Sequence, residues 1–211
     1  MAKFPEPPGV AALRNIAPQT RILEADTMLA RIYFAAGPYP SRWNQFRSVG
    51  PTAARWDHHL PNARDVPVEQ SRAIFYCAPE IATCAAEVFQ ATRRIDRTRN
   101  APGLVVFALR EGVTLLDLRG AFATTIGAST AMHSGPRSRA RAWARELYEA
   151  YPDIQGLYYG SSMNGHAPAI VLNERAQQAM PGQPQLHRAL NDDLLVETLQ
   201  QIALHLSYGL R

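Results

Sequence analysis

The sequence predicts a mixed α+β fold. Apolar segments with the β-branched and aromatic composition of strands are interspersed with segments whose apolar residues recur at helical spacing. No regular strand–helix–strand repeat and no internal sequence repeat is present, which argues against a doubly wound parallel sheet. With 211 residues, 46% of them hydrophobic and 19% charged, the chain is expected to bury one core. We therefore expect a single domain over residues 27–211, preceded by a proline-rich arm over residues 1–26.

The expected elements follow from local composition and periodicity. Six segments have strand character: 27–35, 73–78, 103–109, 113–118, 156–160 and 167–172. Four segments have helical character: 79–90, 136–150, 174–180 and 191–208. Residues 120–135 are small and polar and are expected to be irregular, and residues 37–70 form a long aperiodic stretch. A loop as long as 37–70 inside one domain is usually either functional or wrongly assigned as a loop, and the functional interpretation is favoured here.

The strand and helix over residues 73–90 form the unit around which the chain is organised. Pro79 suits the first turn of the helix, where its missing N–H costs nothing. The residues at helical spacing make one core-facing stripe: Ile81, Cys84, Ala85 and Val88. Glu87 lies just off that stripe, where a helix can direct a carboxylate into a cleft, and Tyr76 carries the hydroxyl of the strand.

Several classes of function are not supported by the sequence. Cys77 and Cys84 match no metal or redox spacing and are predicted to be small buried side chains. The adjacent His58 and His59 would point to opposite sides of an extended segment, so no metal site is expected. The net charge of +4 is mild, and the arginines are not interleaved with aromatic residues, so direct nucleic-acid binding is not expected. Without a signal-peptide core or a membrane-length apolar run, a soluble, cytoplasmic protein is expected.

The remaining polar residues fit one kind of chemistry. An arginine, a tyrosine, a glutamate and a serine lie beside short strands, and such a set suits cleavage of a glycosidic bond whose leaving group departs without a proton. The nicotinamide bond of NAD is of that kind, and a carboxylate near the ribose stabilises its oxocarbenium-like transition state. Arginine binds diphosphate oxygens in pairs, and a flat aromatic ring can stack on nicotinamide.

The order of these residues resembles the RES-domain family, which is named for an Arg, a Glu and a Ser spread along the domain. The resemblance covers roughly residues 28–176. It is carried by these segments: Arg31-Ile32-Tyr33, Ala54-Arg55-Trp56-Asp57, Ile74-Phe75-Tyr76, Ala85-Ala86-Glu87, Leu115-Leu116-Asp117-Leu118, Gly156-Leu157-Tyr158-Tyr159-Gly160-Ser161-Ser162 and Val171-Leu172-Asn173-Glu174-Arg175.

The resemblance implies a fold like that of the ADP-ribosyltransferases and a function in NAD consumption. Characterised members are toxins of bacterial toxin–antitoxin pairs, and some transfer ADP-ribose to a protein. The implied substrate is therefore NAD, and the implied partner is a helix-turn-helix antitoxin. The expected activity is that of an NAD glycohydrolase or phosphorylase, with a protein ADP-ribosyltransferase or a non-catalytic nucleotide- or partner-binding module as the alternatives.

The resemblance also implies site residues. The implied catalytic residues are Arg55, Glu87 and Ser161. The implied NAD-binding residues are Arg31, Tyr76 and Ser162. Ser162 is also an alternative to Ser161, because the doublet leaves the register uncertain by one residue.

The loop before the central unit leaves alternatives open. Ala53 and Ala54 stand where family members often have two glycines, and Arg42 or Arg47 could replace Arg55 as the diphosphate ligand. The insertion over residues 58–70 could reshape the pocket entrance or hold a partner. The arginines of the helix over residues 136–150 are interpreted as a solvated face, with a phosphate or partner patch as the alternative: Arg137, Arg139, Arg141 and Arg145. The sequence leaves open the acceptor (water, phosphate or protein) and whether the chain forms a homo-oligomer.

Overall fold

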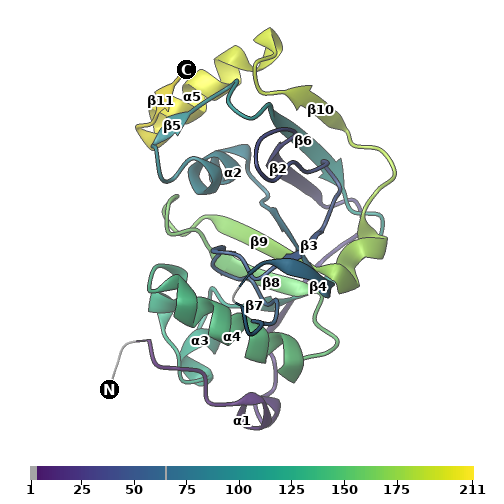
Figure 1. Cartoon of the computed structure of the whole chain (residues 1–211), viewed down its shortest axis with the longest axis vertical. Coiled ribbons are helices and arrows are strands. Elements are labelled where there is room, and N and C mark those ends of the chain that lie inside the picture. The colour runs from purple at the N-terminus through teal and green to yellow at the C-terminus, as the bar shows by residue number, and fades with distance from the viewer. Residues whose placement is uncertain (1–3, 65) are drawn as a thin grey trace.

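The computed structural model describes residues 4–64 and 66–211 and confirms the mixed α+β fold. A six-stranded sheet crosses the middle of the molecule (Figure 1), in the order β1 (Thr20–Leu23), β7 (Val113–Asp117), β8 (Gly156–Gly160), β9 (Pro168–Asn173), β4 (Val68–Cys77) and β3 (Arg47–Gly50). Strands β7 and β8 pair in parallel, and the other neighbours are antiparallel. A second sheet has the order β10 (Leu186–Ala189), β6 (Pro102–Ala108) and β2 (Met28–Phe34).

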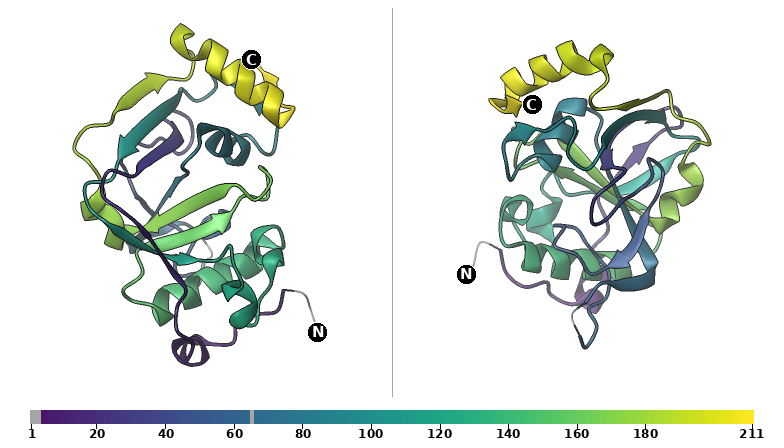
Figure 2. Two further views of the ribbon diagram at one scale, coloured as in Figure 1. Left: turned by 180° about the vertical axis from the view of Figure 1, so that it is seen from behind. Right: turned by 45° about the horizontal axis from the view of Figure 1, so that its top comes forward.

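The helices lie on both sides of the central sheet. Figure 1 shows α4 (Arg137–Ala150) on one side and α2 (Ile81–Val88) with the second sheet on the other, a separation that the reverse view in Figure 2 also shows. The remaining helices are α1 (Val10–Arg14), α3 (Phe122–Thr125) and α5 (Val196–Leu206), with 3-10 turns η1 (Thr130–His133), η2 (Glu174–Ala179) and η3 (Asp193–Leu195). A short parallel pair, β5 (Arg94–Ile95) and β11 (Gly209–Leu210), lies near the C-terminus.

All six predicted strands are present, and the differences lie at boundaries and in loops. Helix α2 begins at Ile81, so Pro79 precedes the helix and is not in its first turn. Residues 120–135 were expected to be irregular but contain α3 and η1, whose short turns carry no helical periodicity that a sequence window could detect. The helix expected over residues 191–208 is shorter, because η3 precedes α5. Residues 37–70 contain β3 and the start of β4.

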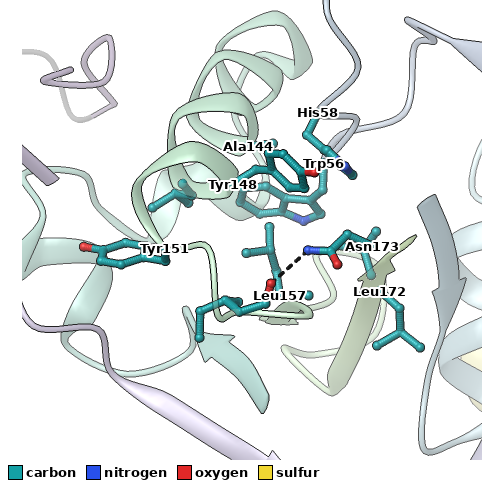
Figure 3. A pocket seen from close by; sticks show the side chains of 12 residues that line it. Trp56, His58, Ala144, Tyr148, Tyr151, Leu157, Leu172 and Asn173 are labelled. Atoms are coloured by element: carbon teal, nitrogen blue, oxygen red, sulfur yellow. Dashed lines mark hydrogen bonds between the residues drawn. The ribbon is translucent and has the colours of Figure 1, made fainter. Parts of the chain in front are cut away.

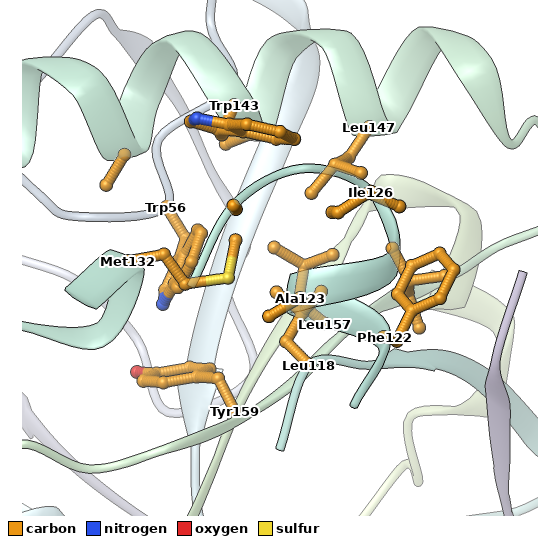
Figure 4. Packing of buried hydrophobic residues seen from close by; sticks show 14 of the residues in the cluster. Trp56, Leu118, Phe122, Ala123, Ile126, Met132, Trp143, Leu147, Leu157 and Tyr159 are labelled. Atoms are coloured by element: carbon orange, nitrogen blue, oxygen red, sulfur yellow. The ribbon is translucent and has the colours of Figure 1, made fainter. Parts of the chain in front are cut away.

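One core lies between α4 and the central sheet (Figure 4). The side chains of Trp143 and Trp56 are 0% and 1% exposed, and they pack with Leu147, Leu157 and Tyr159. The predicted apolar face of α4 is therefore confirmed, because Trp143 and Leu147 lie one turn apart on the buried side.

A second core lies between the two sheets. Phe75 of β4 meets Phe107 of β6 edge to face at a centroid distance of 5.8 Å, and both are fully buried. The sheets are joined by a backbone pairing in which Ala30 and Ala78 exchange hydrogen bonds of 2.7 and 3.0 Å. Cys84 donates to the Ala30 carbonyl at 3.1 Å and is buried, as predicted from the sequence.

The described part of the N-terminal segment packs on the domain. Phe4 and Leu13 belong to the core beneath α4, and β1 pairs with β7 along its four residues. Trp143 donates its indole N–H to the Pro5 carbonyl at 2.9 Å. None of the described helices combines the length and the apolar composition that crossing a membrane requires.

A small pocket lies beneath α4 (Figure 3). Its volume is about 20 Å³, and Trp56, Tyr148 and Leu157 are among the side chains that line it. The ring of His58 stacks on Tyr148 at its edge, with centroids 4.4 Å apart. A pocket of this size holds about one water molecule. It is therefore a feature of the packing and too small for a substrate.

Candidate functional site

The large cavity of the molecule opens between α2, the first half of α4, strands β2 and β4, and the loop that contains β3. Its volume is about 1240 Å³. This exceeds the roughly 300–1,000 Å³ of most small-molecule pockets, so the cavity can hold an extended ligand. Among the described residues that line it, Glu87 is the one carboxylate and six are arginines: Arg31, Arg47, Arg55, Arg137, Arg141 and Arg145.

Glu87 is held in place by Ser161. The Ser161 hydroxyl donates a hydrogen bond of 2.6 Å to Oε1 of Glu87, and the Ser161 side chain is 0% exposed. The same hydroxyl oxygen accepts hydrogen bonds from the backbone N–H groups of Met163 at 3.1 Å and Asn164 at 3.2 Å. Because its oxygen already accepts two N–H groups, the hydroxyl proton of Ser161 is directed to the carboxylate. Ser161 therefore fixes one carboxylate oxygen and leaves the other side of Glu87 toward the cavity.

The turn after β8 is also tied directly to α2. Asn164 donates its side-chain N–H to the hydroxyl of the buried Thr83 at 3.0 Å. The contacts at Glu87 and Thr83 lie on adjacent positions of one helical face, because residues four apart share a side of the helix. The strand end and the helix are thereby locked together at the point where Glu87 enters the cavity.

Two tyrosines line the cavity wall beside Glu87. The Tyr76 hydroxyl accepts a hydrogen bond of 3.1 Å from the backbone N–H of Trp56, which fixes the ring against the loop. Tyr159 packs against the Trp56 indole with centroids 5.5 Å apart. Burial raises the pKa of both phenols, and the nearby charge of Glu87 raises them further. Both tyrosines therefore remain neutral at physiological pH and present aromatic surface to the cavity.

Arg55 is anchored at the same end of the cavity. Its Nη1 donates to the carbonyl of Gly135 at 2.7 Å and to that of Met132 at 3.4 Å. Burial lowers the pKa of Arg55 and the neighbouring charge of Arg137 lowers it further, whereas Glu87 acts in the opposite sense. The guanidinium remains charged near neutral pH, and its backbone contacts hold it near enough to Glu87 to feel its charge, with no ion pair to any of the described residues.

Arg31 enters the cavity from β2. Its guanidinium lies over the Phe75 ring, 4.0 Å from the centroid, and Nη1 donates to the Gln45 carbonyl at 3.2 Å. Burial lowers the pKa of Arg31 to about 10, so the side chain is still cationic at neutral pH. A half-buried cation that has no carboxylate partner among the described residues is a strong anion ligand.

The loop that delivers Arg55 is fixed by a buried aspartate. Asp57 accepts hydrogen bonds from the N–H and hydroxyl of Thr52 at 2.7 and 2.5 Å and from the backbone and ring of His59 at 2.9 and 2.7 Å. Burial alone would raise the pKa of Asp57, but these hydrogen bonds outweigh it and hold the pKa well below its usual range. Arg47 donates to the Thr52 hydroxyl at 3.0 Å and lies 3.9 Å from Asp57.

The structure brings most of the sequence-predicted site residues to one cavity. The following predicted residues line it: Arg31, Arg55, Tyr76, Glu87 and Ser162. Ser161 lies behind Glu87 and is absent from the described lining. Of the alternatives to Arg55, Arg47 lines the cavity and Arg42 is exposed outside it.

The insertion over residues 58–70 divides between the core and the rim. Pro61 and Pro67 line the cavity, whereas His58 and His59 are buried away from it. His59 bonds to Asp57, and His58 lies 3.5 Å from Glu174. Within residues 4–64 and 66–211, no group of three or more His, Cys, Asp or Glu side chains is placed to hold a metal ion.

Several cavity residues were not among the predicted site residues. Tyr159 and the buried His133 line the wall, and three arginines of α4 line it as well: Arg137, Arg141 and Arg145. The spacing of four residues in this arginine set was a usable signal, because it places the three side chains on one helical face. Arg139, which was grouped with them, points elsewhere and pairs with Glu6 at 2.8 Å.

The fold and the cavity together define a class of α+β protein. In this class a buried serine holds a glutamate in a cavity lined by arginines. The RES domain family model matches residues 18–192, and the chain belongs to this family. The search of curated proteins found no match.

A solved structure shares the fold. A chain in the crystal structure of the M. tuberculosis MbcT–MbcA toxin–antitoxin complex matches with a TM-score of 0.55, over 89% of this chain and 94% of its own. The two sequences are 16% identical, so the likeness concerns the fold alone.

Proposed function

We propose that this protein is an NAD-consuming enzyme that cleaves the nicotinamide–ribose bond. The main support for this proposal is the position of Glu87 in a cavity lined by six arginines. Glu87 is the one carboxylate among the described lining residues. A carboxylate in such surroundings lies where it can act on a positive charge that develops in a bound anionic substrate.

The chemistry needs little beyond this carboxylate. The bonding pair of the C1′–N bond goes to the ring nitrogen, and the pyridinium leaves as neutral nicotinamide without taking up a proton. Positive charge then develops on the ribose, and Glu87 stabilises it electrostatically. The acceptor adds to C1′ and loses a proton, and with water as acceptor the products are ADP-ribose, nicotinamide and H⁺.

The other lining residues support binding of the dinucleotide. Arg55 and Arg31 supply uncompensated cations for the diphosphate. Tyr76 and Tyr159 supply neutral rings for the nicotinamide end, and the exposed hydroxyl of Ser162 supplies a hydrogen bond there. Ser161 acts through Glu87 and is assigned a positioning role.

Family membership and the structural neighbour support a toxin function. The neighbour belongs to a toxin–antitoxin complex, and on this basis we propose that the present chain is a cytoplasmic toxin with an antitoxin partner of the helix-turn-helix type. A cavity of about 1240 Å³ has room for a polypeptide segment of such a partner at its mouth.

The proposal is tested by incubating the purified protein with NAD and identifying the products by liquid chromatography and mass spectrometry. Free ADP-ribose indicates a glycohydrolase, a phosphorylated ADP-ribose formed only in phosphate buffer indicates a phosphorylase, and a labelled protein in a lysate indicates a transferase. NAD binding without nicotinamide release, together with harmless expression in a bacterial host, would refute the enzyme assignment and favour a binding module.

A further inference from the structure

A row of arginines extends the cavity along α4, away from Glu87. Arg137, Arg141 and Arg145 all line the cavity and follow one another at intervals of four residues. Eight residues of helix span about 12 Å at 1.5 Å per residue. Arg137 lies at the end of the row that is nearest to Glu87. It donates a hydrogen bond of 2.8 Å to Gln90 Oε1, and its charge lowers the pKa of Arg55. Arg141 and Arg145 therefore lie at increasing distance from the carboxylate.

The two distant arginines have no partner within the protein as described. Arg139 of the same helix pairs with Glu6 at 2.8 Å and bonds to the Phe4 carbonyl at 2.6 Å. Arg141 and Arg145 make no hydrogen bond or ion pair with any residue in 4–64 or 66–211. Burial lowers the pKa of Arg145 and the adjacent charge of Arg141 lowers it further, whereas the charges of Asp57 and Glu146 act in the opposite sense without forming an ion pair with it. This end of the cavity therefore carries positive charge that remains available to a bound anion.

The charge pattern distinguishes between the two nicotinamide dinucleotides. In doubly wound dinucleotide-binding folds, a carboxylate binds the 2′-hydroxyl of the adenosine ribose of NAD and an arginine accommodates the 2′-phosphate of NADP. The same preference of a phosphate for arginine applies at a nucleotide site on another fold. Glu87 is the one carboxylate of the described lining. Asp57, whose charge acts on Arg145, is 0% exposed and already accepts hydrogen bonds from Thr52 and His59. Arg55 and Arg31 already supply cations for the diphosphate, so Arg141 and Arg145 exceed what that group needs.

Resting on the proposed function, we infer that Arg141 and Arg145 bind the 2′-phosphate of NADP, which makes the phosphorylated dinucleotide the preferred substrate of the Glu87 site. A phosphate monoester carries about −1.5 to −2 charges at pH 7 and offers three acceptor oxygens. Two planar guanidinium groups one helical turn apart can bind these oxygens in pairs. The same arrangement gives no comparable contact to the uncharged 2′-hydroxyl of NAD.

The inference is tested by comparing kcat/KM for NADP and NAD in the wild type and in the double variant Arg141→Ala/Arg145→Ala. We expect the wild type to favour NADP and the double variant to lose about ten- to a hundredfold on NADP with little change on NAD, as the removal of charged hydrogen bonds predicts. Arg110→Ala is the matched control for loss of charge, because Arg110 is exposed in the turn between β6 and β7 and lies outside the cavity. Equal use of the two dinucleotides by the wild type, or an equal loss on both in the double variant, would overturn the inference.

A binding measurement separates this inference from the proposed function. Isothermal titration calorimetry with adenosine 2′,5′-bisphosphate and with AMP reports on the phosphate subsite without any reaction. Tighter binding of the bisphosphate that disappears in the double variant supports the subsite even where neither dinucleotide is cleaved. Equal binding of the two nucleotides refutes it, whatever the result of the cleavage assay.

Discussion

Ser161→Ala tests whether the buried hydroxyl acts through Glu87. The substitution removes the 2.6 Å hydrogen bond to Glu87 Oε1 and leaves the N–H groups of Met163 and Asn164 without their acceptor. A hydrogen bond to a charged group contributes about 1.5–3 kcal/mol, which corresponds to a roughly ten- to hundredfold change. We expect kcat for nicotinamide release to fall by this factor with little change in KM, because substrate-binding side chains are retained. Thermal unfolding of the variant measures the loss of stability that follows from the two unsatisfied N–H groups of the turn.

A double-mutant cycle with Glu87→Gln separates positioning from direct contact. If Ser161 acts only by orienting the carboxylate, Ser161→Ala has no further effect on kcat once Glu87 is replaced, and the coupling free energy equals the whole effect of the single variant. Ser162→Ala is the comparison, because that exposed hydroxyl lines the cavity directly and its effect should persist in the Glu87→Gln background. Effects of Ser161→Ala and Glu87→Gln that simply add would refute the positioning role.

Three further variants test the framework of the site. Tyr76→Phe keeps the ring but removes the acceptor of the Trp56 N–H, so the free energy of unfolding in urea should fall by about 1–3 kcal/mol, and an unchanged value would contradict this contact. Trp143→Ala removes a fully buried side chain and should lower the same quantity by about 3–5 kcal/mol, whereas a loss below about 1 kcal/mol would contradict the packing. Burial lowers the pKa of His133 from 6.5 to about 4, so the unfolded chain takes up a proton in this window that the folded protein does not. Stability should therefore fall as pH decreases from 6.5 to 4, by at most about 1.4 kcal/mol per pH unit from this group, and His133→Gln should reduce the slope of unfolding free energy against pH.

The central strand and helix could be predicted because their signals are local. Cys84 and Ala85 of the predicted apolar stripe are buried in α2, whereas Ile81 and Val88 are only partly buried, and Glu87 lies beside them at the edge of the buried side. The position of a residue along a helix fixes the face on which its side chain lies. Glu87 could therefore be expected to point into a cleft at the edge of the buried side. The lining of the cavity includes Glu87 and Tyr76, as the sequence indicated.

The role of Ser161 could not be derived from the sequence, because it depends on a contact across 74 residues. A serine at a strand end has the same local pattern whether it faces a ligand, a turn or a carboxylate. The conformation of the loop before β4 could not be predicted from the sequence for a related reason. Its conformation is set by hydrogen bonds to the buried Asp57 from Thr52 and His59, and such contacts leave no periodic signal.

The arginines of α4 show how a periodic signal can be present and still be insufficient. Their spacing indicates a shared face, and the burial of Trp143 shows that this face points away from the core, but only the three-dimensional arrangement shows that it borders the cavity. Arg139 lies two residues from both Arg137 and Arg141 and is bound to Glu6 on another side of the helix.

Glu87 is the group proposed to promote cleavage. The decisive measurement is the rate of nicotinamide release from NAD and from NADP by the wild type, by Glu87→Gln and by Glu80→Gln, with nucleotide binding measured for each protein. Glu80 is an exposed acid at the N-cap of the same helix and provides the matched control. We expect Glu87→Gln to bind nucleotide but to lose at least about a hundredfold in rate, as removal of one transition-state electrostatic contact does, while Glu80→Gln behaves as the wild type. Equal rates for Glu87→Gln and the wild type would contradict this role of Glu87.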